Sequence, residues 1–420
     1  MRTTDDPSLI RRAGLFYFPI ALVARVPFAM MIVGVMTLVV SERGSLSLAG
    51  ATSAFVGAGQ ALCAPLIGAA ADRWGQRSVL LVTAVAESLA LVSIVVATRS
   101  SASDLVVMAM ALLIGAFAPQ VSPMSRSRVV GIVERGFAGA RHASVLNAAM
   151  AYESAADEAV FVFGPVVVGA LATAIDPAAP VLGAAALTLV FVAAFALHPS
   201  ARTIDHVPRG SVPDQAPARE LARPSLIVLV VGTLGVGLFF GSMLTSLTAF
   251  MEDRGMPEQA GLVYGAMGVS SAAFALAGAW FPTRFTLAAR WLTFAGVLCL
   301  ATASLLLAHS VLAMTILIFI VGIGVGPTLV SLYHLGAHRS PKGRSATVMT
   351  MLVSGIVVGQ SATSLLTGVV AQQAGTAAAL LLPFCSAVVL FIAGLANLWL
   401  TRRGAVGTAN DAISETESVL

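Results

Sequence analysis

The feature that most constrains this chain is a series of twelve apolar stretches, each long enough to cross a lipid bilayer as a helix. Such a helix needs about 20 mostly apolar residues. The stretches lie at 15–40, 46–71, 79–97, 105–124, 145–175, 180–197, 226–250, 260–281, 287–307, 311–335, 346–371 and 377–400. Only 10% of the residues are charged, whereas soluble domains carry about 25%. The sequence therefore predicts an all-α membrane protein with twelve transmembrane helices.

The basic residues give this series an orientation, because cytoplasmic loops of membrane proteins carry an excess of Lys and Arg. If the N-terminus lies inside, 20 of the 24 basic residues fall in inner segments, and only Arg43, Arg99 and Arg254 fall in outer loops. The remaining one, Arg25, lies within the first helix. We therefore expect both termini in the cytoplasm and the chain as a multi-pass protein of the cytoplasmic (inner) membrane.

The loop after the second apolar stretch carries the most specific motif. It reads Gly68-Ala-Ala-Ala-Asp72-Arg73-Trp-Gly75-Gln-Arg77. Spacing and position both resemble the loop signature of the major facilitator superfamily of secondary transporters, in particular of its drug and metabolite exporters. A chance positive-inside turn is the alternative. The resemblance implies the major facilitator fold, with two six-helix halves.

The domain organisation expected from this fold follows the composition of the chain. A segment with five prolines and mixed charges separates the sixth and seventh apolar stretches, and such a composition is typical of a linker. We predict an N-terminal six-helix bundle at 1–198, a cytoplasmic linker at 199–224, a C-terminal six-helix bundle at 225–403 and a polar cytoplasmic tail at 404–420.

The resemblance also implies a gate at the cytoplasmic side. In the family, the motif Asp engages the start of the eleventh helix and an Arg from the fourth. Physically, Gly68 permits close helix approach and Gly75 a tight turn, while the Asp72 anion suits a helix N-terminus. The gating residues expected here are Gly68, Asp72, Arg73, Gly75, Arg77, Arg126 and Arg128.

Two further family signatures are incomplete. The second half carries Pro282 where its copy of the loop motif would have Asp, so a second latch of the same chemistry is not expected. The fifth apolar stretch holds Gly164-Pro165, a partial match to a signature of antiporters in the family, for which a simple proline kink is the alternative. Pro and Gly in the fourth and tenth stretches, at Pro119 and Pro327, predict flexible segments beside the cavity, with close helix packing alone as the alternative.

Ionisable residues inside the membrane are costly and point to function. Glu153 and Asp157 are four residues apart and share a helix face, whereas Glu158 lies about 100° from Asp157. Arg25 lies at a similar depth in the first helix, where it can pair with one of these acids. Three carboxylates near one Arg cannot all stay ionised cheaply, so we expect at least one to bind a proton near neutral pH. We predict a proton-coupling site formed by Arg25, Glu153, Asp157 and Glu158. The alternatives are a static charge network and direct contact of the acids with a cationic substrate.

Polar and aromatic side chains of the inner helices are candidates for contact with a substrate, although most polar residues in membrane helices bond to a neighbouring helix. The cavity is otherwise expected to be apolar, which suits an amphiphilic substrate. The candidates are Gln120, Asn147, Tyr152, Phe239, Phe240 and Gln360.

These patterns predict a proton-coupled exporter of amphiphilic small molecules, such as drugs or metabolites, that works by alternating access. A proton-coupled importer of a small solute and a non-transporting membrane ligand sensor remain alternatives. Neither a nucleophile motif, nor a nucleotide loop, nor clustered metal ligands are apparent, so we expect no enzyme, no cofactor and no metal site. The expected partners are a small-molecule substrate, protons and the lipid bilayer; we expect no nucleic acid and a monomeric chain.

Overall fold

The computed structural model describes residues 8–203, 215–256, 259–282 and 284–418, and these residues form helices without any strand. Twelve segments of the described chain are long and apolar enough to cross a membrane, which confirms the twelve transmembrane helices predicted from the sequence. Their bounds agree with the apolar stretches to within a few residues, except that the fourth span continues to Gly136 and the eleventh to Ala379. There the helices extend past the apolar stretches into polar sequence.

The N-terminal half holds the first six spans. A short helix, α1 (Leu9–Ala13), precedes them. The spans are α2 (Tyr17–Val23) with α3 (Val26–Arg43), α4 (Leu46–Trp74), α5 (Gln76–Arg99), α6 (Asp104–Phe117) with α7 (Val121–Gly136), α8 (Gly139–Ala174), and α9 (Ala179–Leu187) with the π-helix η1 (Thr188–Val192) and α10 (Ala193–Leu197).

The C-terminal half follows after two short 3₁₀ helices, η2 (Pro199–Thr203) and η3 (Ala218–Ala222). Its spans are α11 (Pro224–Glu252), α12 (Ala260–Ala277) with η5 (Gly278–Trp280), α13 (Leu287–Ala303) with η6 (Ser304–Leu307), α14 (Val311–Arg339), α15 (Ser345–Ala379) and α16 (Leu382–Ser418). Helix α16 continues without a break from the last span into the polar tail.

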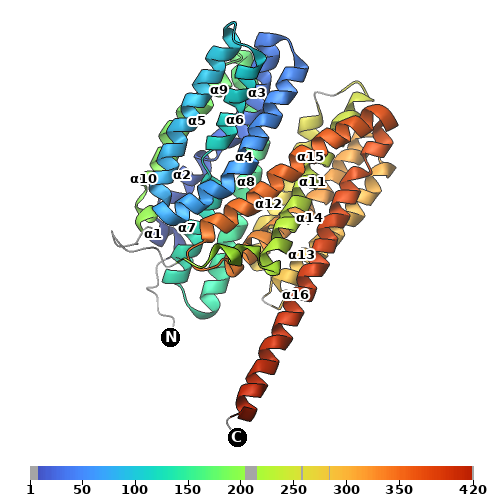
Figure 1. Ribbon diagram of the computed structural model, residues 1–420. Helices are drawn as coiled ribbons and strands as arrows, with labels where there is room; N and C mark the ends of the chain where they lie inside the picture. Colours follow the sequence, from blue (N-terminus) through green and yellow to red (C-terminus); the bar gives the residue numbers. More distant parts are fainter. Residues whose placement is uncertain (1–7, 204–214, 257–258, 283, 419–420) are drawn as a thin grey trace.

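The two halves lie side by side, and α1 and the last turns of α16 lie at the same end of the molecule (Figure 1). We call this end the terminal end. The halves meet where α4 packs against α15 and where α8 packs against α12 and α14. Small residues permit this approach: a Cβ atom on Gly57 would lie 3.0 Å from Ser361 Oγ.

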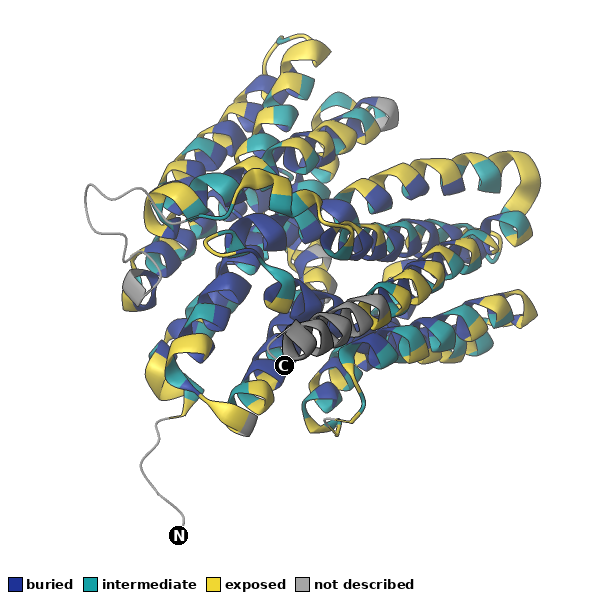
Figure 2. Cartoon of the chain, turned by 60° about the horizontal axis from the view of Figure 1, so that its bottom comes forward, coloured by how far each residue is buried: buried dark blue, intermediate teal, exposed yellow. Residues whose placement is uncertain are grey.

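The outer surface of the helices is apolar. Large hydrophobic side chains such as Leu62, Leu300 and Leu365 are more than two-thirds exposed, and exposed residues follow the outer faces of the helices while buried ones face the interior (Figure 2). A surface of this kind is stable in lipid, which hydrogen-bonds to nothing and therefore needs no polar coat. The exposed residues thus mark the faces that lipid solvates.

Two spans of the N-terminal half are interrupted beside prolines. The first breaks at Ala24 and Arg25, just before Pro27, and the fourth breaks at 118–120, around Pro119. Pro27 and Pro119 each lack the backbone N–H that would bond to the preceding turn. At the second break, Ala118 before Pro119 also leaves the helical conformation, with ψ of 118°. The tenth span does not break at Pro327, and α14 continues through this residue. Beside it, Thr328 Oγ1 donates to the carbonyl of Gly324 at 2.7 Å.

Candidate functional site

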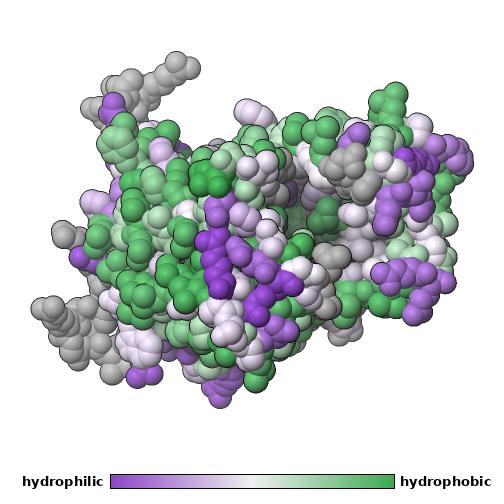
Figure 3. Space-filling model, turned by 90° about the horizontal axis from the view of Figure 1, so that it is seen from above, coloured by the Kyte–Doolittle hydropathy of each residue, from purple (hydrophilic) through white to green (hydrophobic). Residues whose placement is uncertain are grey.

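A cavity of about 490 Å³ lies between the two halves. Seen from the end opposite the termini, the molecule is hollowed between the halves (Figure 3). Its lining is mainly apolar, and Arg25 and Asp157 supply the charged groups. The lining residues include Arg25, Phe28, Ile32, Ser53, Gln120, Ser122, Asp157, Val160, Phe161, Tyr333, Ile356, Val357, Gln360, Ser361 and Leu365. The cavity therefore has the two-part lining that an amphiphilic ligand would fit.

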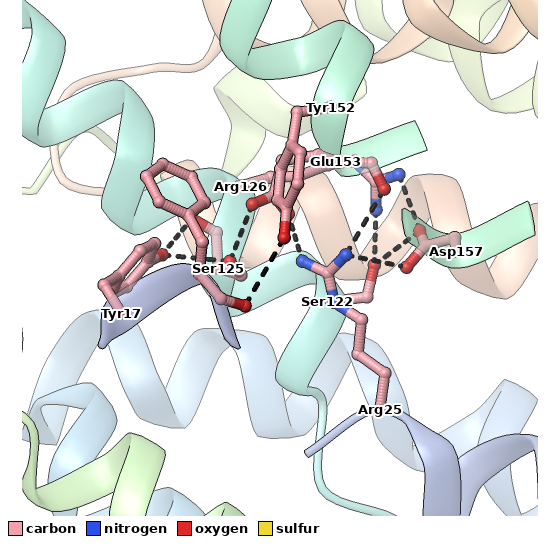
Figure 4. A network of polar contacts seen from close by, with 9 residues as sticks. Tyr17, Arg25, Ser122, Ser125, Arg126, Tyr152, Glu153 and Asp157 are labelled. Carbon is pink, nitrogen blue, oxygen red and sulfur yellow. Dashed lines mark hydrogen bonds and ion pairs between the residues drawn. The ribbon is translucent and has the colours of Figure 1, made fainter. Parts of the chain in front are cut away.

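Arg25 lines the cavity and is paired with the acids of α8 (Figure 4). Its guanidinium forms an ion pair with Glu153 through Nη2 and lies 3.3 Å from Asp157 Oδ1 through Nη1. The break between α2 and α3 leaves Arg25 just outside the regular helix, where its side chain reaches α8. The sequence predicts one such pair, and the structure contains both.

Arg126, from the first turns of α7, completes the compensation of Asp157. Its Nη2 donates to Asp157 Oδ2 at 2.6 Å, its Nη1 donates to Ser122 at 2.5 Å, and its guanidinium carbon lies 3.7 Å from the centroid of the Tyr333 ring. Ser122 and Arg126 are four residues apart in α7, about one helical turn. Both therefore lie on the face toward α8, where they contact Asp157. The loop motif implies a role for Arg126 in the cytoplasmic gate, whereas the structure places it in the acid cluster.

Hydroxyl groups extend this cluster within the N-terminal half. Ser125 Oγ donates to Glu153 Oε1 at 2.9 Å, and the Tyr17 hydroxyl lies 2.9 Å from Ser125 Oγ and donates to the Ser125 carbonyl at 3.1 Å. Ser122 Oγ also lies 2.7 Å from Asp157 Oδ2. The cluster thus holds two cations and two carboxylates, and its charges balance. Sequence reasoning missed these hydroxyls, since serine and tyrosine in apolar stretches carry no signal of which helix they face.

Glu158 lies apart from this cluster, as its position in the helix predicts. It is 7% exposed, and its Oε1 accepts a hydrogen bond from Ser271 of α12 at 3.0 Å. No ion pair among the described residues involves Glu158, and it is not among the residues that line the cavity. Its contact therefore crosses from the N-terminal half to the C-terminal half without a compensating charge.

Asp72 joins the halves at the terminal end. Its carboxylate accepts hydrogen bonds from the backbone N–H groups of Ala346 and Thr347 at 3.0 and 2.7 Å and from the Thr347 hydroxyl at 2.6 Å. A carboxylate is favourable there because the first N–H groups of a helix have no intrahelical partner and carry partial positive charge. The engagement of the eleventh span by Asp72, implied by the loop motif, is thus present at the start of α15.

The other motif residues serve this contact in different ways. A Cβ atom on Gly68 would lie 2.8 Å from the Ala346 carbonyl, so only glycine fits between α4 and α15. Gly75 turns the chain from α4 into α5 with φ of 86°, a conformation that glycine adopts without strain. Arg73 and Arg77 are exposed. Arg128 donates to Gln76, to the Phe195 carbonyl and to Ser200, all within the N-terminal half.

A second contact at the terminal end uses different chemistry. Asn147 of α8 donates from Nδ2 to the Gly278 carbonyl at 2.7 Å, and its Oδ1 accepts from Arg290 Nη1 at 3.0 Å. Arg290 also donates to the carbonyls of Phe281, Pro282 and Phe285 at 2.8 to 3.3 Å. The loop that lacks the motif Asp is thus joined to α8 through its carbonyls. From its place in the sequence, Arg290 is expected only to orient the chain in the membrane.

The residues predicted to contact a substrate divide into two groups. Gln120 and Gln360 line the cavity. Asn147 lies in the contact with Gly278, the Tyr152 hydroxyl donates to the Phe18 carbonyl at 3.4 Å, and Phe239 is fully buried in the core with Phe240 packed beside it. These four do not line the cavity in this conformation.

The family model of the Major Facilitator Superfamily matches residues 18–354 of the chain. The chain belongs to this superfamily. Membership makes it a membrane transporter by family, with a small-molecule substrate, rather than a member of an enzyme family. A comparison with curated protein sequences finds no relative.

Several solved structures share the fold over nearly their whole length. The human organic anion transporter MFSD10 (TETRAN) is 18% identical with a TM-score of 0.69, and the alignment covers 92% of this chain and 99% of that one. A bacterial homologue of the iron transporter ferroportin, in an outward-facing state with soaked iron, is 16% identical with a TM-score of 0.69 and coverage of 92% and 98%. The E. coli fucose:proton symporter FucP is 14% identical with a TM-score of 0.65 and coverage of 91% and 99%. At these identities the similarity establishes the fold alone.

Proposed function

We propose that this chain exports amphiphilic small molecules across the cytoplasmic membrane by alternating access, in exchange for protons, and that Glu158 carries the proton. The observation that carries this proposal is the contact between Glu158 and Ser271. A buried carboxylate without a cationic partner is costly, and a bound proton removes that cost. Glu153 and Asp157 are compensated by Arg25 and Arg126 and need no proton for this reason.

The position of Glu158 provides a physical route from protonation to conformation. The contact joins α8 of one half to α12 of the other, so the halves cannot separate there without exposing the carboxyl group to water. A neutral carboxyl group favours the buried contact, and an ionised one favours separation. Proton binding therefore has different affinities in the two conformations, which is the requirement for coupling.

The present conformation represents one end of this cycle. The cavity lies between the halves, while Asp72 and Asn147 hold the halves together at the terminal end. With the terminal end in the cytoplasm, as the distribution of basic residues favours, this is an outward-facing state with the proton bound. In the proposed cycle, Glu158 would take up its proton from the outside by way of the cavity before the contact with Ser271 closes. The proton would leave to the cytoplasm after the terminal end opens, and substrate would enter there from the cytoplasm.

Two alternatives use the same fold. A proton-coupled importer would have the same contacts and the opposite substrate flux, and a non-transporting sensor would bind ligand without net flux. The partial antiporter signature at Gly164 favours export. In the structure, a Cβ atom on Gly164 would lie 2.5 Å from the Ala29 side chain, so the glycine brings α8 close to α3.

The test is proton movement in everted membrane vesicles that contain a pH-sensitive dye. Wild type is compared with Glu158→Gln, Asp157→Asn and Glu153→Gln over a panel of anionic, neutral and cationic amphiphiles. Glu87→Gln is a matched control, because Glu87 is another buried acid and binds Thr188 on the far side of the N-terminal half. Fluorescence of a fused reporter confirms equal amounts of each variant.

We expect a substrate-induced loss of the proton gradient in wild type and in Glu87→Gln, and none in Glu158→Gln. Substrate-induced proton flux that persists in Glu158→Gln would refute the assignment of the carrier. Uptake of substrate into cells along the proton gradient would replace export by import. Binding without flux of either substrate or protons would favour the sensor.

A further inference from the structure

A residue that lines the cavity carries a buried donor without an acceptor among the described residues. This donor is the Nε–H group of Arg25, whose side chain is only 3% exposed. The terminal nitrogens of Arg25 are occupied by Glu153 and Asp157. Buried polar groups of native proteins nearly always have partners, so this unpaired donor is available to a ligand atom that accepts a hydrogen bond.

The same region has no carboxylate available for a cation. Asp157 is the one acid among the described residues that line the cavity, and it is 20% exposed. Its oxygens are occupied by Arg25, Arg126 and Ser122, at distances of 2.6 to 3.3 Å. A cationic ligand would have to displace a guanidinium from Asp157, whereas an acceptor group on a ligand would displace nothing from Arg25. Glu158 faces α12 and does not line the cavity.

We propose that the transported amphiphile is an organic anion, whose carboxylate or sulfonate binds Arg25 while its apolar body lies between the halves. The inference rests on the proposed export and names the substrate class of the same cavity. The apolar body would contact Phe28 and Phe161, whose rings lie edge to face at a centroid distance of 5.9 Å, and Ile356 and Val357 of α15. A cavity of about 490 Å³ accommodates a molecule of two or three fused or linked rings.

The electrostatics of the transport step agree with an anionic substrate. The cluster of Arg25, Arg126, Glu153 and Asp157 is neutral as a whole, so an arriving anion meets no net repulsion, and the guanidinium of Arg25 offers a charge-assisted hydrogen bond. A membrane potential that is negative inside drives an anion outward. Glu158 lies on a different face of α8 from Glu153 and Asp157, the acids that bind Arg25. Substrate and proton therefore need not compete for one group and are coupled through the conformation.

The test is equilibrium binding to the full-length protein in nanodiscs of zwitterionic lipid, which requires neither flux nor a proton gradient. Two fluorescent probes share one apolar skeleton: 8-anilinonaphthalene-1-sulfonate is anionic, and N-phenyl-1-naphthylamine is neutral. The quantity measured is the ratio of their dissociation constants, after subtraction of binding to empty nanodiscs. Tetraphenylphosphonium is the cationic competitor.

The decisive variant is Glu153→Gln, which removes one carboxylate from Arg25 and leaves the guanidinium in place. We expect affinity for the sulfonate to rise at least about tenfold relative to the neutral probe. The reason is that removal of a full negative charge within a few ångströms of a buried site changes the binding of another charge by about tenfold or more. Partial unfolding would expose apolar surface to both probes, so only a change in the ratio of their dissociation constants counts as a gain at Arg25. The double variant Arg25→Gln/Glu153→Gln removes both charges together and should bind the two probes with nearly equal affinity.

Glu87→Gln serves as control and should leave the ratio of the two probes unchanged. An unchanged ratio in Glu153→Gln, or displacement of the sulfonate by tetraphenylphosphonium with a stronger effect in wild type than in the variant, would overturn the anionic substrate. This outcome is independent of the proton carrier, because Glu158→Gln tests coupling in vesicles and Glu153→Gln tests charge preference at equilibrium. Each proposal can therefore fail while the other stands.

Discussion

Helix α8 carries two polar stripes that differ in what they bind. Glu153 and Asp157 form the first stripe and pair with Arg25 and Arg126 of their own half. Asn147 and Glu158 form the second stripe, about 20° apart around the helix axis, and both bind residues of the other half. The first stripe is ionic and balanced, and the second consists of neutral or uncompensated groups.

This difference separates two tasks that a transporter must perform on one helix. Contacts within a half can be ionic because they persist through the whole cycle. Contacts between halves form and break once per cycle, and a strong buried ion pair there would be slow and costly to separate. In the proposed cycle, the first stripe would therefore maintain the N-terminal half, and the second stripe would control how the halves meet.

The largest expected effect is on stability, at the first stripe. Glu153→Ala leaves Arg25 with a partly uncompensated buried charge, and breaking a buried pair in this way costs about 3–5 kcal/mol. Glu158→Gln replaces a carboxyl group by an amide of the same size and should change the free energy of unfolding by less than about 1 kcal/mol. The measurement is unfolding of purified protein in mixed micelles by increasing SDS.

A matched double variant isolates the contribution of charge at the first stripe. Arg25→Met together with Glu153→Met removes both charges and keeps apolar volume, which should recover most of the lost stability. Equal loss of stability in Glu153→Ala and Glu158→Gln would contradict the division between the two stripes.

A smaller effect is expected at the charged contact between the halves. Asp72→Ala removes three hydrogen bonds to the start of α15. Asp72 is only partly buried, so water can bind the freed N–H groups, and we expect a net loss of about 1.5–3 kcal/mol for the contact as a whole. The equilibrium constant for closure of the terminal end should fall by a factor of about ten to a hundred. Spin labels at the exposed positions 77 and 402, after replacement of the native cysteines, report the distance between the halves at this end.

Asn147→Ala should have the smallest effect. It removes a neutral contact to Gly278 and one of several partners of Arg290, whose remaining partners belong to its own half. The expected cost is about 1 kcal/mol, visible in the same spin-label distances as a smaller shift than that of Asp72→Ala. A larger shift in Asn147→Ala than in Asp72→Ala would reverse the expected order of the two variants and would make the second stripe the principal gate.

Much of this arrangement could be predicted from the sequence, because it follows from length and periodicity. Apolar length gives the twelve helices, and the helical period separates Glu158 from Glu153 and Asp157. The depth of Arg25 in its helix predicts its pairing with α8. The loop motif predicts close helix approach at Gly68, and the structure shows why a side chain would not fit there.

What could not be predicted depends on the direction in which a side chain turns between helices. Arg126 and Arg128 are two residues apart on one helix, yet Arg126 binds Asp157 of α8 and Arg128 binds Gln76 of α5. Arg290 has the position of an ordinary cytoplasmic arginine and contacts Asn147 because α13 lies beside the loop with Pro282. Such choices are made by tertiary packing, for which the local sequence pattern carries no signal.

Infrared difference spectroscopy of the purified protein between acidic and alkaline pH can identify the proton carrier without any substrate. Glu87 is a second buried acid without an ion pair among the described residues, so the experiment uses Glu87→Gln as its background. The carbonyl stretch of a buried protonated carboxylic acid is compared in this background alone and after addition of Glu158→Gln, Asp157→Asn or Glu153→Gln. We predict that this band titrates in the background, remains when Asp157→Asn or Glu153→Gln is added, and is lost when Glu158→Gln is added. A band that remains in Glu158→Gln and disappears in Asp157→Asn or Glu153→Gln would show that an acid of the first stripe binds the proton and that Glu158 is not its carrier.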